Sequence, residues 1–200
     1  MKNSLKKLLL VVLFVGVNLG AITLEESAKQ ISDAKHQDFK QVMICEREAM
    51  FIEKNPQECL KAVDMLLKSK KNLKSTPNYR LDYFGVSEEI MKLLTPDDYK
   101  KTNKEFIDEY IAESYVNAGV VYVALNQNEK KIEMYKKALE YIPNDKQLNF
   151  NLGIDYYLGQ GVAVNKIKAY EHWRVAAREG DKSAQKNLDI LCRESPWACK

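Results

Sequence analysis

The sequence predicts an all-α protein built of helix–turn–helix repeats that stack as a short α-solenoid. Three observations lead to this fold class. Apolar residues recur at spacings of three and four through most of the 200 residues, which is the period of a helix. Segments with the alternating pattern of a strand are nearly absent. Finally, two segments in the second half of the chain repeat one another, and such self-similarity is typical of stacked helical units.

Residues 1–21 have the layout of a secretory signal peptide. The short basic stretch MKNSLKK precedes the apolar run LLLVVLFVGV, and small residues follow up to Ala21. The run is too short to span a membrane as a finished helix, and the alternative is a retained N-terminal anchor. We therefore expect cleavage near Gly20 or Ala21, a periplasmic or secreted protein, and no stable membrane insertion after cleavage.

The net charge does not indicate a nucleic-acid partner. The chain has 31 Lys and Arg against 28 Asp and Glu, a formal charge of +3. Cleavage would remove Lys2, Lys6 and Lys7 and leave equal numbers of basic and acidic side chains. Binding to phosphate backbones depends on a surplus or a patch of basic residues. The lysine-rich stretch 68–74 is better explained as the solvated C-terminal end of a helix.

Four cysteines remain after the expected cleavage, at Cys45, Cys59, Cys192 and Cys199. An even number behind an export signal favours disulfides. Of the three possible connectivities we favour Cys45–Cys59 with Cys192–Cys199, since Pro196 would end a helix and let the tail fold back. A zinc site is the alternative, but the spacings match no common ligand pattern and histidine is scarce. We expect no metal and no other cofactor.

Residues 22–94 are expected to form an N-terminal helical region. One long helix or two broken helices precede NPQECLKAVDMLLKSKK, where Asn55 serves as the cap and Pro56 occupies the first turn of a further helix. The repeat region is expected to cover residues 95–200. It begins with a helix that is capped by Thr95 and closes with a C-terminal capping helix.

The repeat itself is visible in two aligned stretches, YVNAGVVYVAL and NFNLGIDYYLG. One constant spacing, here called the first-helix offset, aligns Asn117, Gly119 and Tyr122 with Asn151, Gly153 and Tyr156. A slightly longer spacing, the second-helix offset, aligns Tyr135 and Ala138 with Trp173 and Ala176. The additional residues fall in a widened turn. A weaker third copy, QKNLDILC, repeats Asn151 and Leu152 as Asn187 and Leu188.

The small residues of this pattern are interpreted as packing devices. A glycine on the first helix and an alanine on the second let two helices approach closely, and we expect Gly153 to face its partner helix near Ala176. The aromatic residue of each helix would fill the space beside that contact. One hairpin leaves an apolar face uncovered, so neighbouring units are expected to stack on it.

Residues 112–144 resemble a tetratricopeptide repeat. They carry Tyr115, Gly119, Tyr122, Tyr135, Ala138 and Pro143 at the spacing of that family and depart from it at Lys131, where the family usually has a small residue. Residues 151–184 look like the related Sel1-like repeat, with its longer inner turn and with Gly153, Tyr156, Trp173 and Ala176 in place. The resemblance implies a curved helical scaffold that binds proteins or peptides on its concave face, and it implies no reaction.

The resemblance also implies that the first helix of each unit lines the groove. The matching residues are Val116, Val120, Val123, Phe150, Ile154 and Tyr157. They are apolar or aromatic, which suits an apolar or amphipathic segment of a partner. The alternative is that the N-terminal helices cover them. We expect a non-catalytic adaptor of the bacterial cell envelope with a protein or peptide partner.

An enzyme is the second hypothesis. Ser183 and Lys186 have the Ser-x-x-Lys spacing of penicillin-recognising enzymes, and some cysteine-rich Sel1-like proteins are described as weak β-lactamases or penicillin binders. The companion motifs Ser-Asp-Asn and Lys-Thr-Gly are absent, and the repeats here lack internal cysteines. No catalytic residue is therefore assigned, and His172 is expected to be a surface residue.

Overall fold

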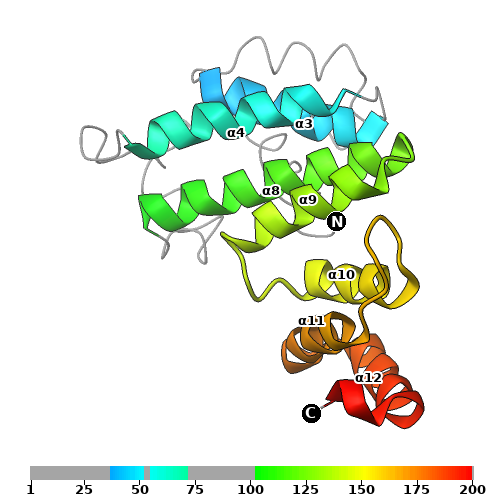
Figure 1. Ribbon diagram of the computed structural model, residues 1–200. Helices are drawn as coiled ribbons and strands as arrows, with labels where there is room; N and C mark the ends of the chain where they lie inside the picture. Colours follow the sequence, from blue (N-terminus) through cyan, green and yellow to red (C-terminus); the bar gives the residue numbers. More distant parts are fainter. Residues whose placement is uncertain (1–36, 52–54, 72–101, 200) are drawn as a thin grey trace, which may run out of the picture.

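The computed structural model describes residues 37–51, 55–71 and 102–199, and these residues form an all-helical protein (Figure 1). They contain seven α-helices, one short 3-10 helix and no strand, which confirms the predicted all-α class. In chain order the elements are α3 (Gln37–Phe51), α4 (Pro56–Lys71), α8 (Asn103–Ala124), α9 (Asn128–Leu139), α10 (Lys146–Leu158), α11 (Lys166–Arg178), α12 (Lys182–Glu194) and the 3-10 helix η2 (Pro196–Cys199). The expected signal peptide, residues 1–21, and the expected cap Thr95 lie outside the described residues.

Side-chain caps fix where several of these helices begin. The side chain of Asn55 accepts a hydrogen bond from the N–H of Gln57 at the start of α4, as the sequence predicted. α8 starts with a capping box, in which the side chains of Thr102 and Glu105 each accept a hydrogen bond from the other's backbone N–H. Asp145, Asn165 and Asp181 cap α10, α11 and α12 with their side chains.

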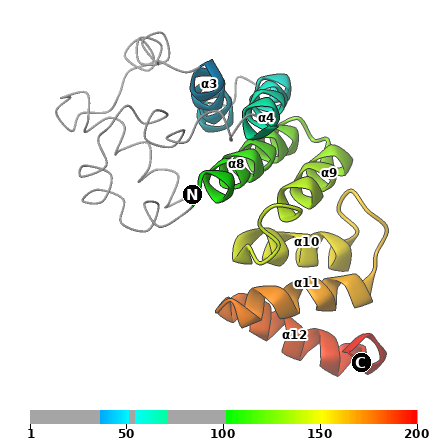
Figure 2. The ribbon, with the colours of Figure 1, turned by 90° about the vertical axis from the view of Figure 1, so that its left-hand side faces the viewer.

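Three buried clusters hold the helices together, and each is built by helices that follow one another in the chain. The first cluster lies between α3, α4 and α8 and includes Phe106. The second, with Leu152, joins α8, α9 and α10, and the third, with Trp173, joins α10, α11 and α12. The helices therefore descend in order from α3 and α4 to α12 (Figures 1 and 2). The first cluster takes side chains from both expected regions, 22–94 and 95–200.

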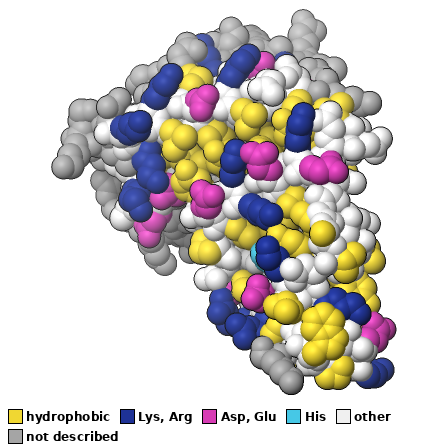
Figure 3. Space-filling view, in the orientation of Figure 1, with side chains coloured by type: hydrophobic (Ala, Val, Ile, Leu, Met, Phe, Trp, Pro, Cys, Tyr) yellow, Lys and Arg dark blue, Asp and Glu magenta, His cyan; other side chains and the backbone are white. Residues whose placement is uncertain are grey.

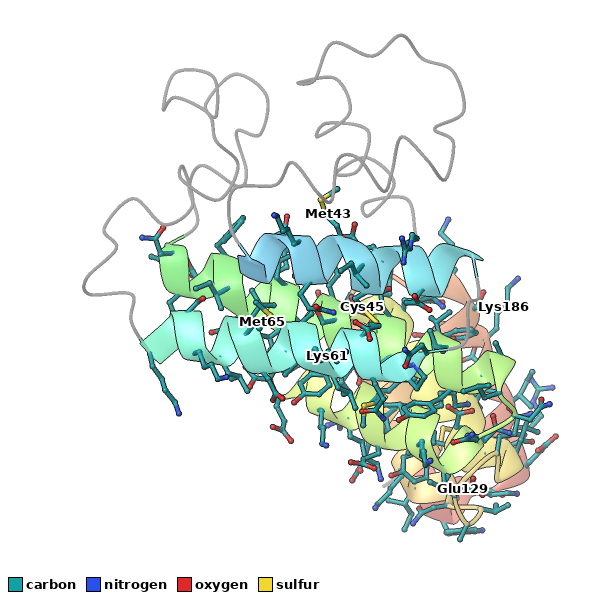
Figure 4. All side chains as sticks on the ribbon, turned by 90° about the horizontal axis from the view of Figure 1, so that it is seen from above. Met43, Cys45, Lys61, Met65, Glu129 and Lys186 are labelled. Carbon is teal, nitrogen blue, oxygen red and sulfur yellow. A yellow bond between two sulfur atoms is a disulfide. The ribbon has the colours of Figure 1, made fainter. Side chains whose placement is uncertain are left out.

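A disulfide joins α3 to α4 inside the first cluster. Cys45 is bonded to Cys59, their Cα atoms are 4.4 Å apart, and both side chains are fully buried. Figure 4 shows Cys45 between these two helices. The second disulfide, Cys192–Cys199, ties η2 back onto the end of α12, with the Cα atoms 5.6 Å apart. Both predicted pairings are confirmed, and no cysteine of the described residues is left free.

In each unit, the first and second helices meet through a glycine–aromatic contact at corresponding positions. A Cβ atom built on Gly119 would lie 2.4 Å from Cε1 of Tyr135, and one built on Gly153 would lie 2.3 Å from Cδ1 of Trp173. Each glycine thus lies directly under an aromatic ring of the partner helix. Gly153 therefore faces its partner helix α11 at close approach, as expected, and the three atoms nearest to its Cβ position belong to the ring of Trp173, one turn before Ala176.

The widened turn of the second unit rests on the first unit. Gly159 and Gly161 adopt φ values of 75° and 76°, the left-handed region that glycine enters without strain. A Cβ atom on Gly161 would also lie 2.5 Å from the carbonyl carbon of Asn128, the first residue of α9. Gly161 is therefore a packing residue between units as well as a turn residue.

Candidate functional site

The six apolar residues that were predicted to line a groove are called the apolar stripe below. The stripe consists of Val116, Val120 and Val123 on α8 and Phe150, Ile154 and Tyr157 on α10. Val120 and Val123 are 39% and 46% exposed, so α3 and α4 leave them open to solvent. Val116 is half-buried against the second cluster, and the three α10 residues are half-buried against the third. The α8 end of the stripe is the more accessible end.

Tyr157 is fixed by three neighbours. Its hydroxyl donates a hydrogen bond of 2.9 Å to Oε2 of Glu194 on α12, and this bond raises the pKa of Tyr157. Its ring lies 5.4 Å from the ring of Trp173, between centroids, and the ammonium of Lys166 lies 5.9 Å from it. Tyr157 therefore links α10 to α11 and α12 in addition to any role at the surface.

One exposed apolar residue that corresponds by sequence to a member of the apolar stripe, Ile190 on α12, was not predicted. Ile190 is 46% exposed. It follows Ile154 by the same spacing that relates Leu188 to Leu152 in the weak third copy. The signal was thus present in the sequence, because continuing that copy along the chain places Ile190 at the position of Ile154. Val120, Ile154 and Ile190 occupy equivalent positions on three successive first helices.

A buried ion pair connects the two units and was not predicted. Nζ of Lys131 on α9 lies 2.6 Å from Oδ1 of Asp155 on α10, and the two side chains are only 8% and 4% exposed. Burial raises the pKa of Asp155, while the ammonium of Lys131 opposes that rise. Burial and the nearby carboxylate of Asp155 also raise the pKa of Tyr135 to about 12. Lys131, which departs from the tetratricopeptide pattern of the first unit, thus forms an ion pair with Asp155 of the second unit.

Lysines lie over the repeated tyrosines in both units. Lys130 lies 5.5 Å from the ring centroid of Tyr122, and Lys168 lies 5.2 Å from that of Tyr156. The tyrosines are related by the first-helix offset and the lysines by the second-helix offset. The same cation–π contact is therefore built twice, by corresponding residues.

His172 is not the simple surface residue that was expected. It is half-buried and stacks on Tyr156, with the ring centroids 5.6 Å apart and the planes 8° apart. Its Nδ1 lies 2.9 Å from Oδ1 of Asn149 on α10. Burial lowers the pKa of His172. The expectation failed because its partners come from α10, and sequence proximity to Trp173 does not reveal them.

Ser183 and Lys186, the pair behind the enzyme hypothesis, lie near the start of α12. Both are exposed, and Figure 4 shows Lys186 extending away from the helices. The backbone N–H of Ser183 donates to Oδ1 of Asp181, which is the N-cap contact of this helix. The structure therefore explains this serine as part of a helix start on an open surface.

Within the described residues, no group of three or more His, Cys, Asp and Glu side chains is arranged to hold a metal ion. No helix in those residues has the length and apolar character needed to cross a membrane.

Comparison with known proteins returns no relative for this chain. No family model matches it, and no match is found among curated proteins or among solved structures.

Proposed function

We propose that the protein is an exported, non-catalytic scaffold that binds a segment of a partner protein along the apolar stripe and Ile190. We assign its helical hairpins to tetratricopeptide and Sel1-like repeats that stack as a short α-solenoid, and we place it in the periplasm of a bacterium or outside the cell. The partner segment is apolar or amphipathic, since the residues that would receive it are mostly aliphatic.

The repeated contacts support the assignment of repeats. Gly119 lies under Tyr135 as Gly153 lies under Trp173, at the offsets of the sequence repeat. A second pair of contacts, Lys130 over Tyr122 and Lys168 over Tyr156, follows the same offsets. Two independent contacts recur in register. This recurrence is better explained by a structural unit that occurs twice than by a chance similarity of sequence.

The row of Val120, Ile154 and Ile190 is the observation that carries the proposed function. Its two ends, Val120 and Ile190, are 39% and 46% exposed, and Val123 extends it on α8. Single exposed apolar residues need no explanation, but the recurrence of apolar residues at one position of three successive helices supports a shared receiving surface. A partner that covers these side chains would remove them from water, which favours binding.

The proposed location outside the cytoplasm rests on two observations. Two disulfides close within the described residues, and disulfides persist in oxidising compartments such as the periplasm. In addition, residues 1–21 have the charge and hydropathy pattern of a secretory signal. N-terminal sequencing of the protein recovered from a periplasmic fraction should start after Gly20 or Ala21, and an intact Met1 in that fraction would contradict cleavage.

Glutamate substitutions along the row test the binding function. Val120→Glu and Ile190→Glu place a charge on the receiving surface without disturbing a buried core. Ile167→Glu on α11 is the matched control, because Ile167 is 48% exposed and lies on a second helix. A photo-crosslinking residue at position 123 of the wild type identifies the bound partner first.

The affinity of that partner for each variant is then measured with purified proteins. We expect the two row variants to bind about tenfold more weakly or worse, as for a central interface residue, and the control to bind like the wild type. Equal affinity for all three variants would refute the stripe as the binding surface. Circular dichroism spectra that match the wild type confirm that the variants are folded.

A further inference from the structure

Two lysines and a histidine gather around the buried ring of Tyr156. Lys136 on α9 and Lys168 on α11 place their ammonium nitrogens 5.5 Å and 5.2 Å from the ring centroid. His172 stacks on the same ring. Figure 3 shows a dark-blue side chain beside the small cyan area of histidine on this face of the molecule. Three nitrogen-bearing side chains from two helices therefore surround one ring, and both lysines lie close enough to His172 to lower its pKa.

The positive charge in this cluster is not neutralised by an ion pair. Some lysines of the described residues have carboxylate partners, such as Lys137 with Glu133, whereas neither Lys136 nor Lys168 lies within ion-pair distance of a described carboxylate. Both lysines are exposed and thus free to reorient toward a ligand. The acidic group that acts on His172 is Glu171, its neighbour on α11.

The hydrogen bonds around Asn149 determine which nitrogen of His172 carries the proton. The amide nitrogen of Asn149 donates to the carbonyl oxygens of Pro143 and Asp145, both at 2.9 Å. Its Oδ1 therefore accepts, and Nδ1 of His172 is the donor. In the neutral ring Nε2 is an acceptor, and it becomes a donor only when the imidazole is protonated.

We propose that Lys136, Lys168 and His172 form a binding site for a phosphate group. Lysine ammonium groups are common partners of phosphate, and a dianionic tetrahedral group offers enough oxygens for all three side chains. A protonated His172 would add a third donor from Nε2. A single carboxylate has fewer oxygens to match this arrangement.

The preceding unit provides a matched negative control within the same chain. There Lys130 lies over Tyr122 as Lys168 lies over Tyr156. However, Met134 occupies the position of His172 at the second-helix offset. The first unit thus has the lysine–tyrosine contact without the imidazole, and we expect no phosphate site there.

Titration of the folded mature protein with inorganic phosphate tests the site. The ring proton signals of His172 are followed by NMR in a His36→Gln background, which leaves one histidine. We expect a saturable shift, and we expect Lys136→Ala and Lys168→Ala each to weaken binding about tenfold, as for a lost charge-assisted hydrogen bond. Lys130→Ala should bind as the wild type does. No saturable shift, or an equal loss in Lys130→Ala, would overturn the proposal.

Binding should also depend on the protonation of His172. In the free protein burial lowers the pKa of His172, Glu171 opposes this change, and Lys136 and Lys168 add to it. A bound dianion stabilises the imidazolium, so the pKa of His172 should rise on binding and affinity should increase as the pH falls. Sulfate is the probe for this experiment, because it stays doubly charged between about pH 5 and pH 8, where histidine titrates. A sulfate affinity that does not change with pH would exclude a role for His172.

A last comparison distinguishes a free phosphate from a phosphate group on a lipid. Sedimentation with vesicles that contain phosphatidic acid, whose headgroup is a phosphate monoester, is measured for the wild type, Lys136→Ala and Lys130→Ala at fixed ionic strength. Vesicle binding that is lost in Lys136→Ala and kept in Lys130→Ala assigns the site to a lipid headgroup. Phosphate binding without vesicle binding assigns it to a soluble phosphate or phosphate ester. Absence of both refutes the site.

Discussion

The buried ion pair between Lys131 and Asp155 gives the sharpest test of how the two units are joined. Its atoms lie 2.6 Å apart, and its side chains are 8% and 4% exposed, so neither charge is well solvated. Oδ2 of Asp155 is buried and has no hydrogen-bond partner among the described residues. Removing one member leaves the other charge buried and unpaired, which typically lowers the free energy of unfolding by about 3–5 kcal/mol.

Two single variants and one double variant separate the coupling from the cost of burial. Lys131→Met and Asp155→Leu each remove one charge and keep apolar volume at the site. We expect each to be strongly destabilised. The double variant removes both charges, and its stability should lie near that of the wild type or exceed it by about 1–4 kcal/mol. Urea denaturation of the four proteins gives the coupling energy.

The pH dependence of Lys131→Met provides a second readout with a defined sign. Loss of the ammonium raises the folded-state pKa of Asp155 further above its unfolded value. Stability is then present below the unfolded pKa and is lost as the pH rises through the folded pKa. The deficit of this variant relative to the wild type should therefore be largest at neutral pH. In the urea experiment, a double variant whose loss of unfolding free energy equals the sum of the two single losses would refute the coupling between Lys131 and Asp155.

Three further outcomes follow from the structure. Gly153→Leu should lower the free energy of unfolding by about 1–3 kcal/mol or more, because the new side chain collides with the Trp173 ring. Gly180→Ala should lower it by only about 1 kcal/mol, from the positive φ at this position, because its Cβ would meet nothing within 4 Å. Comparable losses of the two variants in thermal denaturation would contradict this contrast. Thr102→Ala removes the capping box of α8 and should cost about 0.5–2 kcal/mol in urea unfolding, and an unchanged midpoint would show that the cap is redundant. Thiol titration of the denatured, unreduced protein should find no free thiol, and peptide mapping should recover a Cys192–Cys199 link; any other pairing would be incompatible with the fold.

The parts of the fold that could be predicted from sequence are those set by local pattern. The spacing of apolar residues indicated the all-α class, and the two repeat offsets related the pair Gly119 and Tyr135 to the pair Gly153 and Trp173. Pro196 in a short segment between two cysteines was enough to predict the C-terminal disulfide. These signals depend on neighbours in the chain or on an aligned copy.

The features that escaped prediction depend on contacts between helices. Asp155 reads as an ordinary polar residue of an amphipathic helix, and only the approach of α9 to α10 brings Lys131 to it. Tyr157 meets Glu194 across a long stretch of chain, and neither repeat offset relates the two. The capping box of Thr102 and Glu105 at the start of α8 was present in the sequence and was not predicted, whereas the expected cap Thr95 lies outside the described residues.

The sharing of each buried cluster by consecutive helices has a consequence for how the molecule opens. Since contacts are mostly between elements close in sequence, sections of the chain can separate from one end without the loss of the whole interior. Among the described elements, α12 contacts mainly α11 and its own tail η2, to which Cys192–Cys199 ties it, so its amide protons should exchange with solvent before those of α8. Ile190 lies on that same helix. A partner bound at Ile190 would therefore stabilise α12 against local opening, and its binding could be detected as slower amide exchange in α12.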